Sequence, residues 1–327
     1  MATVAAPTVS VVIPVYRARY LRAALESVQA QTFTDYEIIV VDDGSPDRAE
    51  LDACIAAAGP PVRCLRQENQ GPAPARNSAL RAARGRFVAF LDSDDTWEST
   101  YLETQLVDLT QPPRFDMVYC NALMIGQAEE DRRRLTERIP SREPATCIAL
   151  LREEYTVFLS GVVARRDLIL EAGLFDERFV HGEDFDLWVR MLKRGARMGF
   201  QPRVLLNRRL HGESLSSDSL THSEKALLVL AKIATRVDLT VGEREAVNWR
   251  VRSLHAEAGL ERAKRALARG DFGEARVAFK EANGFHRSVK LGLLRMLLRV
   301  WPSMVARIYG SRERRRGLDT SSVSVDR

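Results

Sequence analysis

Three carboxylates, Asp92, Asp94 and Asp95, follow directly on the apolar run 87–91. Clustered carboxylates repel one another, and the free energy of that repulsion rises as water is removed from around them. A metal ion, an arginine or solvent must therefore compensate their charge. Carboxylate oxygens suit Mg²⁺ or Mn²⁺, and such a cation would hold a diphosphate that the carboxylates alone would repel. We interpret the cluster as a metal site that carries a diphosphate.

The elements that must position this cluster alternate between strand and helix along the first half of the chain. Continuous β-branched runs are typical of strands buried on both faces, and apolar residues at helical spacing separate them. Alternation of this kind predicts an α/β fold with a doubly wound, mostly parallel sheet and helices on both faces. The expected strands cover 9–15, 36–43, 62–67, 86–92 and 115–126, and the expected helices cover 19–31, 49–58 and 73–84.

Polar or turn-forming residues follow several of these strands. Pro14 and Tyr16 lie at the end of the first strand, and Asp42 and Asp43 end the second. In parallel sheets, ligands bind beyond the carboxyl ends of the strands. An isolated acidic strand end is usually a solvated loop. Because several such ends converge on one rim here, the pattern favours a binding site.

The second half begins with a polar, irregular stretch and then returns to regular structure. Apolar residues at 185, 188, 189 and 192 predict one face of a helix, so Glu183 and Asp184 would lie at its amino end. Taken alone, these two acids are equally explained by a favourable interaction with the helix dipole. From about residue 220 the sequence becomes helical, with a hairpin turning at 270–271 and a basic, largely apolar tail. We expect a catalytic domain over 1–219 and a helical region over 220–327.

Composition and charge set limits on location and partners. The chain has 327 residues, 45% hydrophobic and 28% charged, with a net charge of +5. Four cysteines without metal-like spacing are typical of reduced thiols in a cytosol. The amino terminus lacks the features of a secretory signal, and no apolar run is long enough to span a membrane. We expect a cytoplasmic protein without a nucleic-acid role. Its tail either packs on the catalytic domain as a core helix or binds the inner face of an anionic membrane.

The sequence resembles the family 2 glycosyltransferases, whose nucleotide-sugar-binding fold is called GT-A. The resemblance covers about 9–216 and rests on four blocks in the family's order. They begin with the strand, helix and acidic strand end of "VVIPVY" to "VVDDGSPD", followed by "GPAPARNSALRAARGRFVAFLDSDD" with the Asp-x-Asp motif. The third and fourth are "GLFDERFVHGEDFDLWVRMLKRG" and "RRLHGESLS". Arg17 replaces the Asn that the family often has after the first-strand Tyr.

The resemblance implies a nucleotide-binding role for the first half of the rim. Pro14 and Tyr16 would frame the nucleobase, and Asp43 would accept a hydrogen bond from it. Arg76 would lie near the nucleotide and help to balance the acidic rim. Asp92 would approach the ribose or the metal's coordination shell.

The resemblance also implies the metal ligands and the base. Asp94 would bind Mg²⁺ or Mn²⁺ directly, and His211 would add a contact to the metal or a phosphate. Asp184 would be the general base and Glu183 would orient the base or the acceptor. The implied reaction is an inverting displacement that moves a sugar from a nucleoside diphosphate sugar, UDP by family habit, to a glycan or lipid-linked acceptor.

Two alternatives remain open from the sequence. One is a nucleotidyltransferase on a related fold, although the glycine-rich loop typical of such enzymes is missing after the first strand. The other is a catalytically degenerate nucleotide-sugar-binding protein that scaffolds a membrane assembly through the helical tail. A broken metal or base motif would favour the scaffold, but Asp94 and Asp184 are both present.

Overall fold

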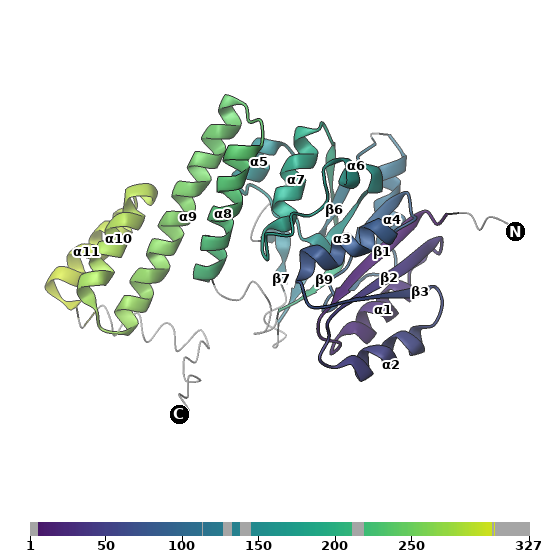
Figure 1. Cartoon of the computed structure of the whole chain (residues 1–327). Coiled ribbons are helices and arrows are strands. Elements are labelled where there is room, and N and C mark those ends of the chain that lie inside the picture. Colours follow the sequence, from purple (N-terminus) through teal and green to yellow (C-terminus); the bar gives the residue numbers. More distant parts are fainter. Residues whose placement is uncertain are drawn as a thin grey trace, which may run out of the picture. The chain divides into compact units, whose positions relative to one another are not determined.

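The structure is a computed structural model, and it describes residues 6–112, 114–126, 133–137, 145–210, 219–302 and 304. Its centre is a nine-stranded sheet, counted within these residues, in the order β3-β2-β1-β4-β8-β6-β9-β5, with β7 paired to β6 (Figure 1). The strands are β1 Val9–Val15, β2 Tyr36–Asp43, β3 Val62–Gln67, β4 Phe87–Phe90, β5 Thr96–Trp97, β6 Met117–Ile125, β7 Arg133–Arg134, β8 Val162–Arg165 and β9 Met198–Arg209.

The sheet has a parallel half and a mixed half. The strands β3, β2, β1 and β4 are all parallel, as the strand–helix alternation predicts. Beyond β4 the pattern changes, because β8 runs antiparallel to both β4 and β6, while β6 and β9 are parallel. The α/β fold is therefore confirmed, and its purely parallel part is the half that carries the first acidic strand ends.

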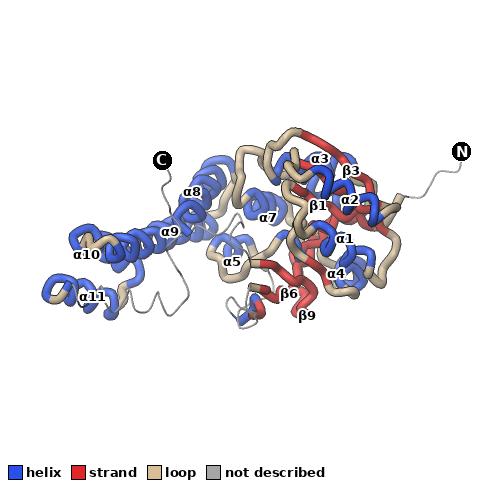
Figure 2. Tube along the Cα trace, turned by 90° about the horizontal axis from the view of Figure 1, so that it is seen from below, coloured by secondary structure: helices blue, strands red, loops and turns tan. Residues whose placement is uncertain are grey.

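Helices cover both faces of the sheet, as Figures 1 and 2 show. The helices longer than one turn in this part of the chain are α1 Leu21–Gln29, α2 Arg48–Ala58, α3 Pro72–Ala82, α4 Tyr101–Thr110, α5 Cys147–Leu151, α6 Arg166–Glu171 and α7 Glu183–Lys193. Alternate strand residues face opposite ways, so Val11 and Ala89 join the core under α1 and α4. Phe90 faces the other side, where its ring meets Phe175 and Trp188 edge-on at 5.6 and 6.5 Å.

The chain divides into two compact units. The first contains the described residues up to 210 together with Val229–Val247, and the second contains 219–228 together with the described residues from 248 onward. The segment 229–247, which lies beyond the boundary expected between 219 and 220, belongs to the first unit. Buried apolar residues such as Ile233 and the ion pairs of Lys232 hold this segment: the Lys232 ammonium lies 2.6 Å from the fully buried Asp186 carboxylate and 2.9 Å from Asp176.

The second unit is built from long helices. These are α8 Ser219–Arg236, α9 Val241–Ala268, α10 Phe272–His286 and α11 Val289–Val300, of which α8 and α9 also contribute to the first unit. The predicted hairpin is present: Gly270 takes a positive φ, and the Asp271 side chain caps α10 by accepting from the Glu274 amide. Among the described residues, no helix is both long and apolar enough to cross a membrane.

Candidate active site

The candidate site lies at the carboxyl ends of the parallel strands. Val15 at the end of β1 is paired with Asp42 near the end of β2, and Asp43 is paired with Gln67 of β3. β4 ends at Phe90, two residues before Asp92. Since these strands are parallel neighbours, the predicted convergence of polar strand ends on one rim is present in the structure.

Asp43 organises the loop between β3 and α3. One of its carboxylate oxygens accepts from Gln67 Nε2 at 2.8 Å and the Gln70 amide at 3.0 Å, and the other from the Gly71 amide at 2.8 Å. A carboxylate has about four acceptor positions, so roughly one remains for a ligand. Gly44 allows the close approach of this loop, because a Cβ there would lie 2.7 Å from the Asn69 nitrogen.

Arg76 of α3 joins two parts of the rim that are distant in sequence. Its Nη2 lies 2.7 Å from Asp92 Oδ1, and its Nη1 lies 2.7 Å from Glu183 Oε1. Arg76 is 5% exposed, so both ion pairs form with little water around the guanidinium. The planar fork of an arginine suits this bridging, because its donors are fixed relative to one another. The guanidinium therefore compensates part of the negative charge of the acidic rim. An arginine was one of the three sources of compensation that the sequence left open.

Asn77, the next residue on α3, holds the segment that leads into α7. Its amide nitrogen donates to the Phe175 carbonyl at 2.9 Å and to Glu177 at 2.8 Å, and its oxygen accepts from the Phe175 amide. The Asn77 side chain is fully buried, so its two bonds to the Phe175 backbone are shielded from water. Consecutive residues of α3 thus fix both the segment before α7 and the first residue of α7. Sequence reasoning missed Asn77, although its position directly after Arg76 could have drawn attention to it.

Ser160 supports the acidic loop after β4 from the short 3-10 turn Leu159–Gly161, which precedes the antiparallel neighbour β8. Its Oγ accepts from the Asp92 amide at 3.1 Å, and its carbonyl accepts from Trp97 Nε1 at 2.6 Å. Its hydroxyl also interacts with the Asp95 carboxyl and lowers the pKa of that group, against the larger rise caused by burial. Ser160 is 2% exposed and holds both ends of the loop 92–97. No sequence signal marks it, because its partners lie more than sixty positions earlier in the chain.

The acids of the loop after β4 lie in different environments. Burial, with added repulsion from Asp94 and Asp92, raises the pKa of Asp95 to about 8, so this carboxyl is largely protonated at neutral pH. One Asp95 oxygen accepts from the Arg209 amide at 2.9 Å, which ties the loop to the end of β9. Asp92 keeps 38% of its side chain exposed. Asp95 is therefore a support residue, and Asp92 is open to a ligand.

The two acids at the start of α7 both have raised pKa values. Burial raises the pKa of Glu183 to about 7, although the Arg76 cation opposes this rise. Burial also raises the pKa of Asp184, while the hydrogen bond from the Phe185 amide and the Arg76 charge oppose it. A carboxylate with a raised pKa is a stronger base, which suits proton abstraction near neutral pH.

Gly182 sets the start of α7, and charge pairs hold the helix behind the site. Gly182 has a φ of +74°, and a Cβ there would lie 3.1 Å from a methyl group of Val229. Four residues into the helix, Asp186 is fully buried and pairs with both Arg190 at 2.8 Å and Lys232. A buried carboxylate is stable only when it is paired in this way. Asp186 thus has a structural role beside the candidate acids Glu183 and Asp184.

The remaining predicted site residues are Pro14, Tyr16 and His211. Tyr16 is 46% exposed just beyond β1, so its ring is open to a ligand, and Pro14 is partly buried on β1. His211 lies outside the described residues. The structure brings Arg76, Asp92 and Glu183 into direct contact.

The acidic rim has the chemistry of a partial metal site. Within the described residues, no three His, Cys, Asp or Glu side chains are grouped as a complete metal cage. Mg²⁺ and Mn²⁺ are commonly held by one or two carboxylates, with phosphate and water oxygens completing the shell. Asp92 and Asp94 therefore fit a cation that arrives with a diphosphate, and they do not fit a tightly held structural metal.

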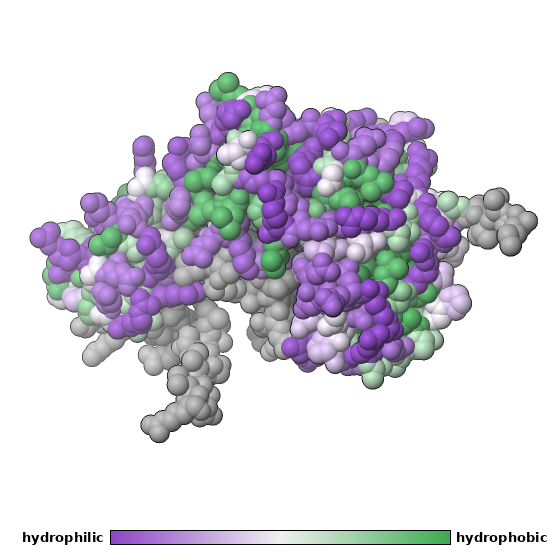
Figure 3. Space-filling view, viewed as in Figure 1, coloured by the Kyte–Doolittle hydropathy of each residue, from purple (hydrophilic) through white to green (hydrophobic). Residues whose placement is uncertain are grey.

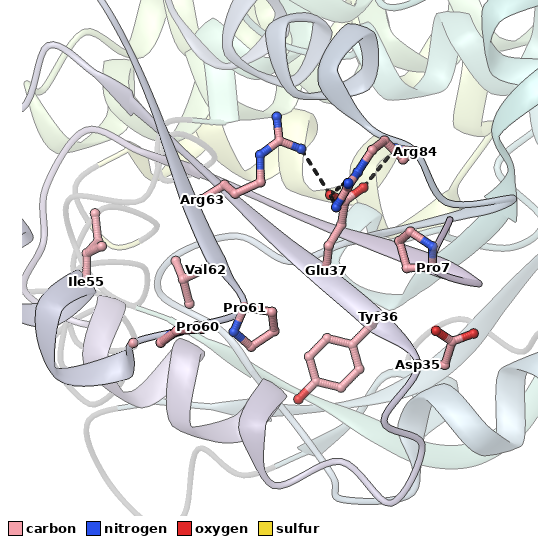
Figure 4. A pocket seen from close by; sticks show the side chains of 11 residues that line it. Pro7, Asp35, Tyr36, Glu37, Ile55, Pro60, Pro61, Val62, Arg63 and Arg84 are labelled. Atoms are coloured by element: carbon pink, nitrogen blue, oxygen red, sulfur yellow. Dashed lines mark hydrogen bonds and ion pairs between the residues drawn. The ribbon is translucent and has the colours of Figure 1, made fainter. Parts of the chain in front are cut away.

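A separate cavity of about 670 Å³ lies at the amino ends of β2 and β3, the edge opposite the acidic rim. Figure 4 shows Arg63 and Arg84 directed at the Glu37 carboxylate, with Tyr36 and Pro61 lower in the view. Glu37 is 3% exposed and pairs with both arginines, at 3.0 and 2.9 Å. These contacts pair Glu37 with both arginines, while Asp35, the other acid of the lining, accepts from Thr8. None of the predicted site residues lines this cavity.

Comparison with known proteins identifies the family. The model of glycosyl transferase family 2 matches residues 10–169. The Escherichia coli protein WfgD, a UDP-Glc:alpha-D-GlcNAc-diphosphoundecaprenol beta-1,3-glucosyltransferase, is 33% identical over 187 residues, which are 57% of this chain and 70% of that one. The chain belongs to glycosyltransferase family 2. The family resemblance seen in the sequence is thereby confirmed, and with it membership of a family of transferases.

Other family members differ in length from this chain. An uncharacterized glycosyltransferase of Rickettsia felis is 29% identical over 226 residues, which are 67% of this chain. The chain spans 37% of the length of that relative and 32% of a similar one from Rickettsia bellii. The matched part of this chain is therefore shared by relatives that carry additional sequence.

Solved structures confirm the GT-A fold. Staphylococcus aureus TarS 1-349 in complex with UDP-GlcNAc has a TM-score of 0.62 at 19% identity, covering 95% of this chain and 92% of that one. The mannosyltransferase PcManGT from Pyrobaculum calidifontis, in complex with GDP-Man and Mn²⁺, has a TM-score of 0.63 at 18% identity, covering 96% and 89%. At these identities the likeness concerns the fold.

Proposed function

We propose that the chain transfers a sugar, with inversion, from a nucleoside diphosphate sugar to a hydroxyl group of a glycan or lipid-linked acceptor. The observation that carries this proposal is the Arg76 bridge between Asp92 and Glu183. It brings the acidic strand end suited to a diphosphate next to the helix start that bears Asp184. A donor-binding group and a base must be adjacent for the acceptor oxygen to attack the anomeric carbon.

We propose UDP as the donor nucleotide. WfgD is named for UDP-Glc, and TarS was solved with UDP-GlcNAc, which supports UDP. The complex of PcManGT with GDP-Man keeps GDP as the principal alternative. In either case Tyr16 would stack on the nucleobase, Pro14 would line the same end of β1, and Asp43 would accept a hydrogen bond from the base.

Asp94, with Asp92, would hold Mg²⁺ or Mn²⁺, and His211 is a further proposed contact to the metal or a phosphate. The complex of PcManGT with Mn²⁺ supports the use of a divalent cation in this fold. When bound, the cation would neutralise negative charge on the departing nucleoside diphosphate. Arg76 contributes fixed positive charge beside Asp92, and it also keeps Glu183 in place.

Asp184 would act as the general base. It would remove the proton of the acceptor hydroxyl as that oxygen bonds to the anomeric carbon. The bond from this carbon to the phosphate oxygen would break on the opposite side, and its electron pair would leave with the nucleoside diphosphate. The raised pKa of Asp184 favours this proton transfer near neutral pH. Glu183, fixed by Arg76, would orient the acceptor.

A catalytically degenerate scaffold remains the alternative in a different class. Family membership weighs against a nucleotidyltransferase, since the matching family is one of glycosyltransferases. The scaffold would bind the same nucleotide sugar but would not turn it over. Donor binding alone cannot distinguish it from the transferase, so the test must separate binding from transfer.

The test is Asp184→Asn, assayed for donor binding and for release of the nucleoside diphosphate in the presence of candidate acceptors. The expected result is donor affinity within about twofold of wild type and a loss of turnover of roughly 100-fold or more. Asp167→Asn on the exposed surface of α6 is the control and should change neither quantity. Equal loss of binding and turnover in Asp184→Asn would contradict the base assignment.

A further inference from the structure

Helix α11 carries apolar residues on two opposite sides. On its inner side, Leu291, Leu294 and Leu298 pack into the core formed with α9 and α10, where Leu298 is 2% exposed. Figures 1 and 2 show α11 lying alongside α10. The sequence left open whether the tail packs as a core helix or binds a membrane. The inner side of α11 is a packed core, within the helical unit.

The outer side of α11 is apolar and exposed. Val289 is 78% exposed, Leu293 56%, Met296 65% and Val300 57%. At 3.6 residues per turn these four residues fall within about 60° of arc, so they form one continuous stripe. We call them the α11 outer face. Just beyond it, Trp301 is 58% exposed. In Figure 3, apolar side chains in green lie among hydrophilic ones over this end of the helical unit.

Cationic residues flank the α11 outer face on both sides. Lys290 lies on one side of the stripe, and Arg295 and Arg299 lie on the other, as their helical positions require. Lys290 and Arg299 are exposed. The sequence has no Asp or Glu between 282 and 312, whereas α9 and α10 contain several acids. Helix α11 itself therefore presents apolar residues and cations and no acid.

We propose that the α11 outer face binds the surface of an anionic lipid bilayer. The four apolar side chains enter the boundary between head groups and acyl chains, and the flanking cations pair with lipid phosphates, as in interfacial amphipathic helices. Trp301 is suited to the same boundary, because its ring is apolar and its indole N–H is polar. This binding does not depend on the transfer reaction proposed above.

Charge decides against a second copy of the chain as the occupant of this face. Pairing two outer faces would bring Lys290, Arg295 and Arg299 of both copies together without any acid from 282–312 to compensate them. Like charges that face each other across an interface oppose association. An anionic lipid surface supplies the missing negative charge and the apolar phase together.

The test is cosedimentation of the full chain with two kinds of vesicle. One is phosphatidylcholine alone, and the other contains about 30% phosphatidylglycerol, which makes the vesicle surface anionic. Binding is expected only with phosphatidylglycerol. Leu293→Ser with Met296→Ser should lower the partition coefficient roughly tenfold or more, because both apolar side chains are removed from the lipid. Lys290→Gln with Arg299→Gln should lower it by a similar factor at low salt.

A matched control separates this face from general surface hydrophobicity. Leu228→Ser with Val277→Ser changes two residues of the same unit that are 64% and 58% exposed, and binding should stay unchanged. Equal binding of wild type to both vesicle types, or equal loss in the control, would overturn the proposal. The proposal would also be overturned if the variant with Leu293→Ser and Met296→Ser differed from wild type in oligomeric state in the absence of lipid. Donor turnover in solution should be unaffected, so failure here is distinguishable from failure of the proposed function.

Discussion

The guanidinium of Arg76 lies 2.7 Å from the carboxylate of Glu183, although the two residues are 107 positions apart in the chain. The pair connects α3, which follows the third strand, to the first residue of α7. The second arm of Arg76 reaches Asp92, so one buried side chain sets the separation of the strand-end acid and the helix-start acid. Asp184 is the next residue after Glu183, and its position therefore depends on Arg76.

Replacing Arg76 with Met should destabilise the fold and abolish transfer. The change leaves Glu183 buried without its cation, which costs about 3 kcal/mol or more in the free energy of unfolding. Urea denaturation measures this cost. Arg81→Met, on the same helix, is the control: its ion pair with Glu177 spans 3.5 Å between side chains that are 59% and 48% exposed. It should cost less than about 1 kcal/mol. Similar costs in the two variants would contradict the role given to Arg76.

Ser160→Ala should weaken metal-dependent nucleotide binding while the protein stays folded. The substitution removes the hydrogen bond to the Asp92 amide and the interaction with the Asp95 carboxyl. The loop that bears Asp94 is then less well fixed. We expect roughly tenfold weaker nucleotide binding with Mn²⁺, and a loss of about 1 kcal/mol in the free energy of unfolding. Titration calorimetry with and without Mn²⁺ measures the first quantity.

Ser10→Ala is the matched control for Ser160→Ala. Ser10 is also fully buried, but its hydroxyl binds Glu37 at 2.8 Å and the Gly85 amide at 2.9 Å, at the opposite edge of the sheet. It should lose similar stability with unchanged nucleotide affinity. If the two variants weaken nucleotide binding equally, Ser160 has only a general structural role.

Much of the fold could be predicted because local patterns determine it. Continuous apolar runs mark β1, β2 and β4, and apolar residues at helical spacing mark α1 and α7. The strand–helix alternation then requires parallel pairing, which places Tyr16, Asp43 and Asp92 at one edge. The mixed half of the sheet was harder to predict, because β8 pairs antiparallel with β4 over only a few residues, and nothing in its own sequence states its direction.

The rest of the site depends on contacts between distant segments. Nothing near Ser160 indicates that its hydroxyl meets the Asp92 amide, and nothing in "DSDD" shows that Asp95 is the buried acid of the three. The segment 229–247 joins the first unit through buried apolar residues and through Lys232, whose partners Asp176 and Asp186 lie before and on α7. Such pairings follow from tertiary packing, and helical or strand periodicity does not predict them.

Glu37→Gln should reduce stability at neutral pH and have a smaller effect in acid. Burial alone would raise the pKa of Glu37, but hydrogen bonds from the Arg84 amide, Ser10, Arg84 and Arg63 outweigh it and lower the pKa below 4.5. The folded state therefore holds this proton less strongly than the unfolded state does. The stabilisation is fully present above pH 4.5 and is lost as the pH falls through the lower folded-state pKa.

Urea denaturation of wild type and Glu37→Gln at pH 7, 5 and 4 measures this effect. The difference in the free energy of unfolding between the two proteins should narrow only at the lowest pH. A constant difference would contradict the lowered pKa.

Removal of the metal, or of Asp94, should remove nucleotide binding selectively. Carboxylates at the rim repel a diphosphate unless a divalent cation lies between them. Calorimetric titration of UDP, GDP and dTDP, each with Mn²⁺ or with a chelator, should show Mn²⁺-dependent binding of one nucleotide, and UDP is the expected one. Asp94→Ala should weaken that binding by roughly 100-fold with Mn²⁺ and should have little effect in chelator. Glu98→Ala is the control. Glu98 is an acid just after the same loop, but its carboxylate accepts from Asn207 Nδ2 at 2.8 Å and is not one of the proposed metal ligands. Equal affinity with and without the metal would show that Arg76, and not a cation, compensates the acids that follow β4.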